Sequence, residues 1–315
     1  MSLERALELA ERGRGTTHPN PVVGAVVTRE GEVVGEGWHE RQGGPHAEVA
    51  ALEAAGERAR GGTLYVTLEP CRSFGRTPPC SAAVLAAGIA RVIVASLDPN
   101  PEAGGGLEEL RAAGVEVELA EGKVAKLARR QNEAWRTWIV QARPFVTYKA
   151  AITLDGRVTV PGSRWVSGEE SRRRVHELRA ASGAVAVGMG AVRADNPRLD
   201  ARDVDADRQP RRLAFGGGPL PEGSELELLS GPLEEESRRL AKEGVQSLLL
   251  EGGPTLATAF LRAGLVDKLL LFVAPRLSGA GPRFLGDFEA PVDLQGVEVE
   301  QVGEDVLVTA YIHEP

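Results

Sequence analysis

Short apolar runs that alternate with helix-forming stretches limit most strongly what this 315-residue chain can fold into. In its first half, residues 63–69, 89–96 and 115–121 read as strands, and stretches rich in Ala, Leu and Glu separate them. Gly88 and Gly114 follow the two intervening stretches, as glycines often do where helices end. Strands that alternate with helices in this way predict a βαβαβ unit with a parallel sheet.

The segments on either side of this unit complete a first α/β domain. Residues 22–37 predict a hairpin that turns at Glu30-Gly31, and residues 46–59 have a helical period and good helix formers. Residues 123–144 read as one helix that ends near its proline. We therefore expect the first domain to cover residues 1–143.

The remaining residues, 144–315, predict a second α/β domain. Residues 145–160 read as a strand that opens a hairpin. Ser167 and Glu170 have the spacing of a capping box for a helix over residues 169–182. No internal repeat relates the two halves.

Further along, residues 184–188 read as a strand and residues 245–275 as a strand, a helix and a strand. The stretch "LLLEGGPTLATAF" places Gly-Gly-Pro between the strand and the helix, where backbone amides can approach a phosphate; it is also ordinary turn chemistry. The charged, Gly/Pro-rich span from about residue 200 to 235 reads as loops.

The composition of the chain limits the kinds of molecule that it can bind. The net charge is -8 and the sequence has no basic run, so the positive surface that nucleic-acid binding requires is missing. No apolar stretch approaches the roughly 18 residues of a membrane span, and the N-terminus is charged rather than signal-like. We expect a soluble cytoplasmic protein with a small-molecule partner, and neither nucleic acid nor membrane as a partner.

The only two cysteines, Cys71 and Cys80, lie in "EPCRSFGRTPPC". Such a pair can be a disulfide, two incidental buried thiols or two ligands of one metal. In the cytosol a cysteine pair is more often metal-binding or catalytic than a structural bridge. His46, Cys71 and Cys80 each follow a proline, which suits the first turn of a helix, where the dipole favours thiolate.

Two thiolates and one neutral imidazole would neutralise a zinc ion and leave its fourth position open, as in catalytic sites. Glu48, two residues after His46, is then the candidate general base and acid for hydrolytic deamination. H-x-E with P-C-x-x-C is the zinc deaminase signature. Here, eight residues instead of two separate the cysteines.

The extended cysteine segment occurs with "THPNPVVGAVV", "HAEVAAL" and "DPNPEAGGGLEELRAAGVEV". Together these motifs resemble the deaminase half of the bifunctional riboflavin-biosynthesis deaminase/reductase family. The resemblance implies a cytidine-deaminase-like α/β/α domain with Zn²⁺ bound by His46, Cys71 and Cys80. It implies that the pyrimidine and ribose-phosphate pocket is lined by Asn20, His39, Arg76, Asp98 and Asn100, with Arg76 as a phosphate partner.

"KAAITLDGRV", "SRWVS", "GMGAVRADNPRLDAR", "EGGPTLATAFLRAGLVD" and "APRLSG" resemble, in order, the reductase half of the same family. That resemblance implies a dihydrofolate-reductase-like domain with NADPH as hydride donor. The cofactor contacts that it implies are Ile152, Trp165, Ala191, Asp195, Gly253, Pro254, Thr255, Leu256, Ala257, Thr258 and Ala259. The substrate contacts that it implies are Lys149, Ser163, Arg179, Leu199, Arg202 and Glu251.

The resulting hypothesis is a bifunctional enzyme. The first domain would deaminate a phosphorylated diaminopyrimidinone ribosylamine, and the second would reduce its ribosyl side chain to ribityl with NADPH. The family also implies a homo-oligomer. Two alternatives stay open: a nucleic-acid base or nucleoside deaminase with an accessory or inactive reductase-like domain, and a structural zinc module fused to a nucleotide-binding regulator. The second alternative requires four protein ligands for the metal.

Overall fold

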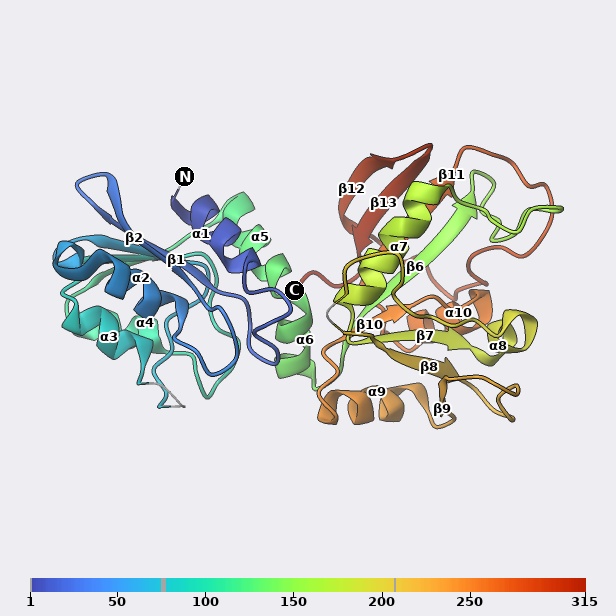
Figure 1. Ribbon diagram of the computed structural model, residues 1–315, viewed down its shortest axis with the longest axis horizontal. Helices are drawn as coiled ribbons and strands as arrows, with labels where there is room; N and C mark the ends of the chain where they lie inside the picture. The colour runs from blue at the N-terminus through green and yellow to red at the C-terminus, as the bar shows by residue number, and fades with distance from the viewer. Residues whose placement is uncertain (1, 75–77, 207) are drawn as a thin grey trace. The chain divides into compact units, whose positions relative to one another are not determined.

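The computed structural model describes residues 2–74, 78–206 and 208–315. By their internal contacts the residues divide into two units, one up to Gln141 that also takes in Pro315, the other Ala142–Glu314 (Figure 1). Each unit has its own sheet and its own apolar core. Within the described residues, no helix is long and apolar enough to cross a bilayer.

The first unit is built on a five-stranded sheet in which β3, β4 and β5 run parallel, as the alternating pattern predicted. β1 is antiparallel to both of its neighbours, β2 and β3. Glu30 and Gly31 have positive φ angles and form the turn between β1 and β2, so the predicted hairpin is confirmed. In sheet order, the strands are β2 (Glu32–Trp38), β1 (Gly24–Arg29), β3 (Thr63–Val66), β4 (Arg91–Val94) and β5 (Glu116–Leu119).

Helices cover both faces of this sheet, which gives the α/β/α layers of the expected fold class. Apolar residues of α2, α3 and α4 pack on one face, and those of α1 and α5 pack on the other. Side chains at Gly35 or Gly37 of β2 would collide with the backbone of α2, so these glycines let α2 lie directly on the sheet. The helices are α1 (Ser2–Glu11), α2 (Ala47–Ala55), the 3-10 turn Gly56–Ala59, α3 (Cys80–Ala86) and α4 (Gly106–Ala112).

The single helix predicted over residues 123–144 is wrong, because two helices occupy this span. They are α5 (Gly122–Gln131) and α6 (Glu133–Gln141), and Asn132 separates them. The Asn132 side chain accepts a hydrogen bond from the backbone N–H of Val22 and donates one to its carbonyl oxygen, both at 2.9 Å. This buried contact with a distant segment favours the break over a continuous helix.

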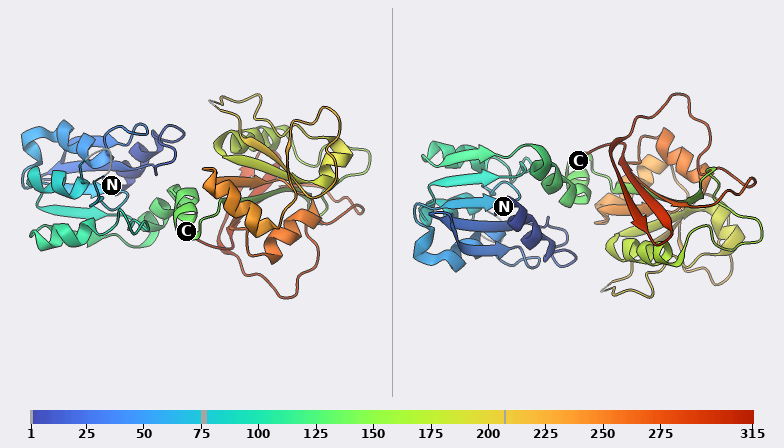
Figure 2. Two further views of the ribbon diagram at one scale, coloured as in Figure 1. Left: turned by 90° about the horizontal axis from the view of Figure 1, so that it is seen from below. Right: turned by 90° about the horizontal axis from the view of Figure 1, so that it is seen from above.

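The second unit contains an eight-stranded sheet that is parallel from β11 to β9. β12 and β13, red in Figure 2, form an antiparallel hairpin at one edge. The strand, helix and strand predicted over residues 245–275 are confirmed as β10, α10 and β11, and the strand at 184–188 as β7. In sheet order, the strands are β12 (Gln295–Val302), β13 (Asp305–Tyr311), β11 (Lys268–Ala274), β6 (Phe145–Thr153), β10 (Ser247–Leu250), β7 (Ala184–Gly188), β8 (Arg211–Phe215) and β9 (Glu227–Leu229).

Helices again lie on both faces. α9 and α10 pack on the face that includes Tyr148 and Leu250, whereas α7 and α8 contribute to clusters on the other face. The helices are α7 (Glu169–Ala181), α8 (Met189–Asp195), α9 (Leu233–Lys242) and α10 (Pro254–Arg262).

Two predictions in this unit are wrong, the loops over residues 200–235 and the hairpin over residues 145–160. The span 200–235 contains β8 and β9, which extend the parallel sheet; only three residues of β8 are buried, so its apolar signal is short. The chain does turn after β6 at Asp155-Gly156, but the returning residues form no strand with β6. Arg157 forms an isolated bridge with Arg283 instead, because β10 and β11 occupy both edges of β6.

The predicted capping box of α7 is also wrong. Gly168 is the N-cap and makes no side-chain capping bond. Asp305, a buried residue at the start of β13, accepts hydrogen bonds from the Gly168 N–H at 2.7 Å and the Ser171 hydroxyl at 2.6 Å. A carboxylate from the hairpin thus takes the place of the local cap.

Candidate active site

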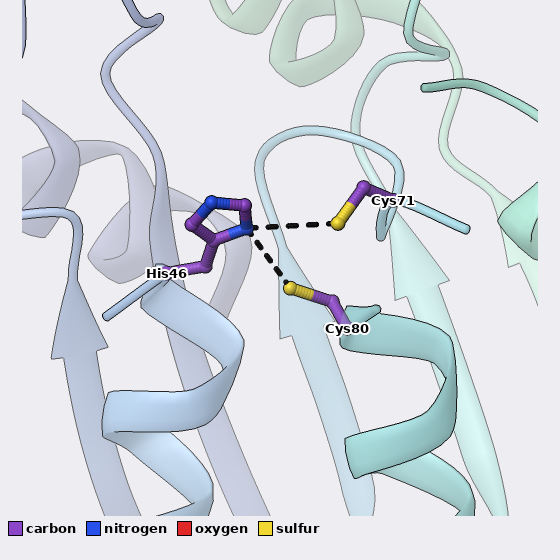
Figure 3. A group of neighbouring side chains, drawn as sticks. All are labelled: His46, Cys71 and Cys80. Carbon is purple, nitrogen blue, oxygen red and sulfur yellow. Dashed lines mark hydrogen bonds between the residues drawn. The ribbon is translucent and has the colours of Figure 1, made fainter. Parts of the chain in front are cut away.

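Three side chains converge where α2 and α3 begin in the first unit. His46 is the N-cap of α2, Cys80 is the first residue of α3, and Cys71 follows β3 in a loop (Figure 3). The Nδ1 atom of His46 lies 3.1 Å from the Sγ of Cys80 and 3.6 Å from the Sγ of Cys71. Helix starts were expected at all three residues, and the expectation fails at Cys71.

The chemistry of these donors fits zinc. Their ligand atoms all lie within 4.8 Å of one another, and both thiols are free. The hydrogen bond between the two thiols lowers the pKa of Cys71 and raises that of Cys80. The hydrogen bond with Cys71 raises the pKa of His46. One imidazole and two thiolates are ligands that zinc prefers, and three protein ligands leave its fourth tetrahedral position for water or substrate.

Glu48 lies in the first turn of α2, two residues after His46, and is 3% exposed. It is not part of the cluster of candidate ligands. Burial raises the pKa of Glu48 to about 7. A carboxyl group with a pKa near neutrality can both accept and return a proton, which is what a general base and acid must do.

A pocket of about 470 Å³ opens onto the cluster. Pockets of this size hold small molecules. This pocket brings together residues that are far apart in the sequence and that were expected to belong to the site. These are Asn20, His39, His46, Glu48, Cys71, Asp98 and Asn100. Arg76, the expected phosphate partner, lies outside the described residues.

His39 and Asn20 form a fixed pair in the wall of the pocket. The Nδ1 of His39 lies 2.9 Å from the carbonyl oxygen of Pro45, which can only accept, so Nδ1 carries the proton. Its Nε2, 3.2 Å from the Nδ2 of Asn20, is then the acceptor. Burial lowers the pKa of His39, which favours the neutral ring. The pair therefore presents a defined pattern of polar atoms to a ligand.

Asp98 and Asn100 belong to a turn that follows β4. The Asn100 N–H donates to Oδ1 of Asp98 at 2.8 Å, a typical Asx turn. Burial raises the pKa of Asp98 to about 6. Asp98 can therefore gain a proton under mildly acidic conditions.

α6 supplies an apolar wall of this pocket that was not expected from the sequence. Trp135, Trp138 and Ile139 line it, together with Glu69 from the segment that leads to Cys71. The spacing of the three apolar residues places them on one helix face. Two tryptophans at that spacing were a signal that could have been used.

In the second unit, Lys149, Arg179 and Glu251 meet in a buried ionic network. Arg179 binds Glu251 with two hydrogen bonds, Nε to Oε1 at 2.6 Å and Nη2 to Oε2 at 3.0 Å, and Lys149 Nζ lies 3.4 Å from Oε2. Burial raises the pKa of Glu251, but Lys149 and Arg179 outweigh it and hold the pKa at about 2. The site thus holds two cations around one carboxylate.

The other three expected substrate contacts differ in where they lie relative to this ionic network. Arg202 is joined to it through Asp200, which accepts from Arg202 Nη1 at 2.6 Å and, at its carbonyl oxygen, from Arg179 Nη1 at 3.2 Å. Leu199 is buried in an apolar cluster with α8. Ser163 lies in an exposed turn, where its hydroxyl donates to the carbonyl oxygen of Trp165.

The expected cofactor contacts come from several elements. Trp165 is exposed, with the guanidinium groups of Arg164 and Arg172 about 5 Å from its ring. Ala191 and the exposed Asp195 lie on α8, and Ile152 is buried near the end of β6. Within 253–259, Gly253 and Thr255 are exposed, Pro254, Leu256 and Ala259 are half-buried, and Ala257 and Thr258 are buried.

The start of α10 fits a phosphate-bearing cofactor. Gly253 is its N-cap, makes no side-chain capping bond and is followed by Pro254. The first-turn backbone N–H groups of such a helix are free to bind an anion. Side chains at Gly188 or Gly252 would press on Leu256, so these glycines keep the start of α10 close to the ends of β7 and β10.

Comparisons with known families agree with the division of the chain into two units. The family model of the cytidine and deoxycytidylate deaminase zinc-binding region matches residues 2–96. The model of the RibD C-terminal domain matches residues 144–217 and 227–308. The first match contains the three candidate ligands and Glu48, and the second contains the ionic network.

Similarity to individual proteins extends over nearly the full length. The chain is 42% identical to riboflavin biosynthesis protein RibD of Aquifex aeolicus, over 97% of this chain and 96% of that protein. The Escherichia coli RibD is 38% identical, over 96% of each chain. Among solved structures, Acinetobacter baumannii RibD matches with a TM-score of 0.85 at 36% identity, covering 98% of this chain and 97% of that one. A Thermotoga maritima diaminohydroxyphosphoribosylaminopyrimidine deaminase/5-amino-6-(5-phosphoribosylamino)uracil reductase matches with a TM-score of 0.84 at 34% identity and the same coverage.

Proposed function

Because this chain belongs to the RibD family of riboflavin-biosynthesis proteins, we propose that residues 1–143 form its deaminase domain and residues 144–315 its reductase domain. The protein is a bifunctional deaminase/reductase of riboflavin biosynthesis. It deaminates the phosphorylated diaminopyrimidine and reduces the ribosyl side chain of the deaminated product. The alternatives of a nucleic-acid deaminase and of a structural zinc module are not favoured, since the family match covers both halves.

In the deaminase domain, the observation that carries the proposal is the placement of Glu48 in the same pocket as His46 and Cys71. His46, Cys71 and Cys80 would hold zinc, which would supply Lewis-acid activation of water near neutral pH. Glu48 takes a proton from the attacking water and delivers it to the departing amine, which leaves as ammonia.

The remaining pocket residues bind and orient the pyrimidine. Asn20 and His39 present a fixed donor and acceptor pattern, and Asp98 and Asn100 face the same pocket from the turn after β4. Trp135 and Trp138 supply an apolar wall that excludes water and packs against the ligand. Arg76 is proposed as the phosphate partner.

In the reductase domain, NADPH supplies the hydride when bound. Gly253 to Ala259, with Ile152, Trp165, Ala191 and Asp195, are proposed to hold the cofactor. Lys149, Arg179 and Glu251, with Ser163, Leu199 and Arg202, are proposed to hold the substrate. The paired guanidinium groups of Arg179 and Arg202, joined through Asp200, suit a sugar phosphate, because a planar guanidinium can bind two phosphate oxygens at once.

The decisive experiment follows product mass with the purified protein and the diaminopyrimidine substrate. Replacement of NH2 by OH raises the mass by about one unit, and reduction adds about two more only when NADPH is present. A mass gain of about one unit with NADPH present, and no further gain, would remove the reductase assignment. No change in a zinc-loaded preparation would remove the deaminase assignment.

We further propose that the protein works in the cytoplasm, where the reducing environment keeps its two free cysteines available to a metal. Family membership also supports a homo-oligomer. Sedimentation at enzyme concentrations would test this assembly, and a particle with the mass of one chain would contradict it.

A further inference from the structure

The deaminase pocket contains a second buried carboxylate, Glu69, which has no part in the chemistry described above. Glu69 is 6% exposed and lies two residues before Cys71. Its Oε1 accepts hydrogen bonds from the N–H of Gly105 at 2.8 Å and of Leu107 at 3.2 Å, and its Oε2 accepts from the N–H of Asp98 at 3.1 Å. One side chain therefore binds three backbone amides of a single segment.

That segment, residues 98–107, packs closely on the loop that carries Cys71. The N–H of Arg72 donates to the carbonyl oxygen of Ala103 at 3.1 Å, and a side chain at Gly106 would collide with the carbonyl oxygen of Pro70. Asp98, Asn100 and Ala103 of the segment line the pocket. The segment thus joins the loop of the metal ligand Cys71 to the wall of the pocket, and its backbone is attached at Glu69.

The contacts of the Glu69 carboxylate do not suit a proton carrier. Both oxygens of Glu69 are occupied by N–H donors, so a role in proton transfer would first require breaking these hydrogen bonds. Hydrogen bonds between a carboxylate and backbone amides are directional and stronger than neutral ones, which suits a group that fixes a loop. Charged acceptors of this kind are costly to lose when the donors are buried.

We propose that Glu69 is a positioning residue of the deaminase. It fixes the segment 98–107 against the metal-ligand loop, so that Asp98 and Asn100 hold the pyrimidine where Glu48 can act on it. The inference rests on the proposed deaminase function of this pocket. Glu69 acts on the substrate through the segment and does not touch the reacting atoms.

The test is Glu69→Gln in the full-length protein. The amide nitrogen of Gln cannot accept, so either the Asp98 N–H or the two amides at the start of α4 lose their acceptor. We expect the KM for the diaminopyrimidine substrate to rise on the order of tenfold, with a smaller change in kcat. Hydrogen exchange should accelerate in peptides covering residues 98–107. Zinc content and reductase kinetics with the deaminated compound should stay at wild-type values.

Glu109→Gln is the matched control. Glu109 is a carboxylate of α4 in the same unit, and its Oε2 accepts one hydrogen bond, at 2.8 Å, from the hydroxyl of Ser81. It is not among the residues that line the pocket. Its loss should leave the KM of deamination and the exchange of residues 98–104 unchanged.

A second variant, Glu69→Asp, keeps the charge but shortens the reach to the amides. It should raise KM as Glu69→Gln does, because position and not charge is at issue. An unchanged KM in both variants would overturn the inference, and so would loss of zinc from both, which would make Glu69 a support of the metal loop only. A wild-type protein without any deaminase activity would overturn the proposed function itself.

Discussion

Two buried glutamates, one in each unit, have opposite electrostatic settings. Glu48 is 3% exposed, and burial raises its pKa to about 7. The Glu251 side chain is 8% exposed; burial raises its pKa as well, but Lys149 and Arg179 outweigh this effect and hold the pKa at about 2. Two well-shielded carboxylates thus become a proton carrier in one pocket and a permanent anion in the other, and the difference lies in the cationic partners.

The two carboxylates serve different uses. Glu48 has a pKa near neutrality, so it can exchange protons during a reaction. Glu251 stays ionised and holds Arg179 and Lys149 in place, which prepares two cations for an anionic sugar-phosphate substrate. Substitutions that remove the proton carrier or the cationic partners can test each half of this statement.

The largest effect is expected for Glu48→Gln. Gln has nearly the same shape but cannot carry a proton, so deamination should fall on the order of 10³-fold, about 4 kcal/mol of transition-state stabilisation. The rate is measured as ammonia release from the diaminopyrimidine substrate. Reduction of the already deaminated compound with NADPH is the control and should continue at the wild-type rate. Loss of both activities in a folded, zinc-loaded variant would contradict two independent sites.

Arg179→Met should have the next largest effect. It removes the bidentate partner of Glu251 and leaves a buried charge, which should destabilise the second unit by about 3 kcal/mol. Urea titration with pulsed hydrogen exchange, read on peptides of β6 and β10, measures this loss. The double variant Arg179→Met/Glu251→Gln should recover part of the stability. If the single variant were as stable as wild type, Glu251 would not depend on its cationic partner.

Sequence analysis found the groups whose signal is local. His46, Glu48, Cys71 and Cys80 form a short motif with a chemical reason for its spacing, and the structure brings them to one place. Glu30-Gly31 is also a local signal, because the two residues of a tight hairpin turn need positive φ. In such cases the residues themselves carry the information.

Several of the failures involve distant partners. Asn132 breaks a helix because its side chain bonds Val22, and Asp305 replaces the predicted cap of α7 because the hairpin brings it there. Trp135 and Trp138 show which face of α6 is apolar, but only the fold shows that this face lines the pocket. Such contacts depend on tertiary packing, which no local pattern encodes.

A pH titration gives a smaller effect of known sign. The pKa of Glu251 is about 2 in the folded chain against the ordinary value of 4.5, so its stabilisation is fully present above about pH 4.5 and is lost as the pH falls towards 2. Between about pH 6 and pH 3, this loss amounts to about 2 kcal/mol. The same exchange measurement on Glu251→Gln should show a shallower dependence. Equal slopes for both proteins would mean that the pKa of Glu251 is not depressed.

Lys149→Met should have the smallest effect. Lys149 Nζ contacts Glu251 Oε2 at 3.4 Å through a single long hydrogen bond, whereas Arg179 keeps both of its shorter ones. Because a bidentate guanidinium supports a carboxylate better than a point charge does, we expect a loss of only about 1 kcal/mol in the second unit. The exchange measurement on β6 and β10 gives this value, and Lys268→Met, at a lysine of β11 beside Tyr311, is the control for losing a lysine from the same sheet. If Lys149→Met destabilised the unit as much as Arg179→Met, the amount of positive charge, and not bidentate geometry, would explain the low pKa of Glu251.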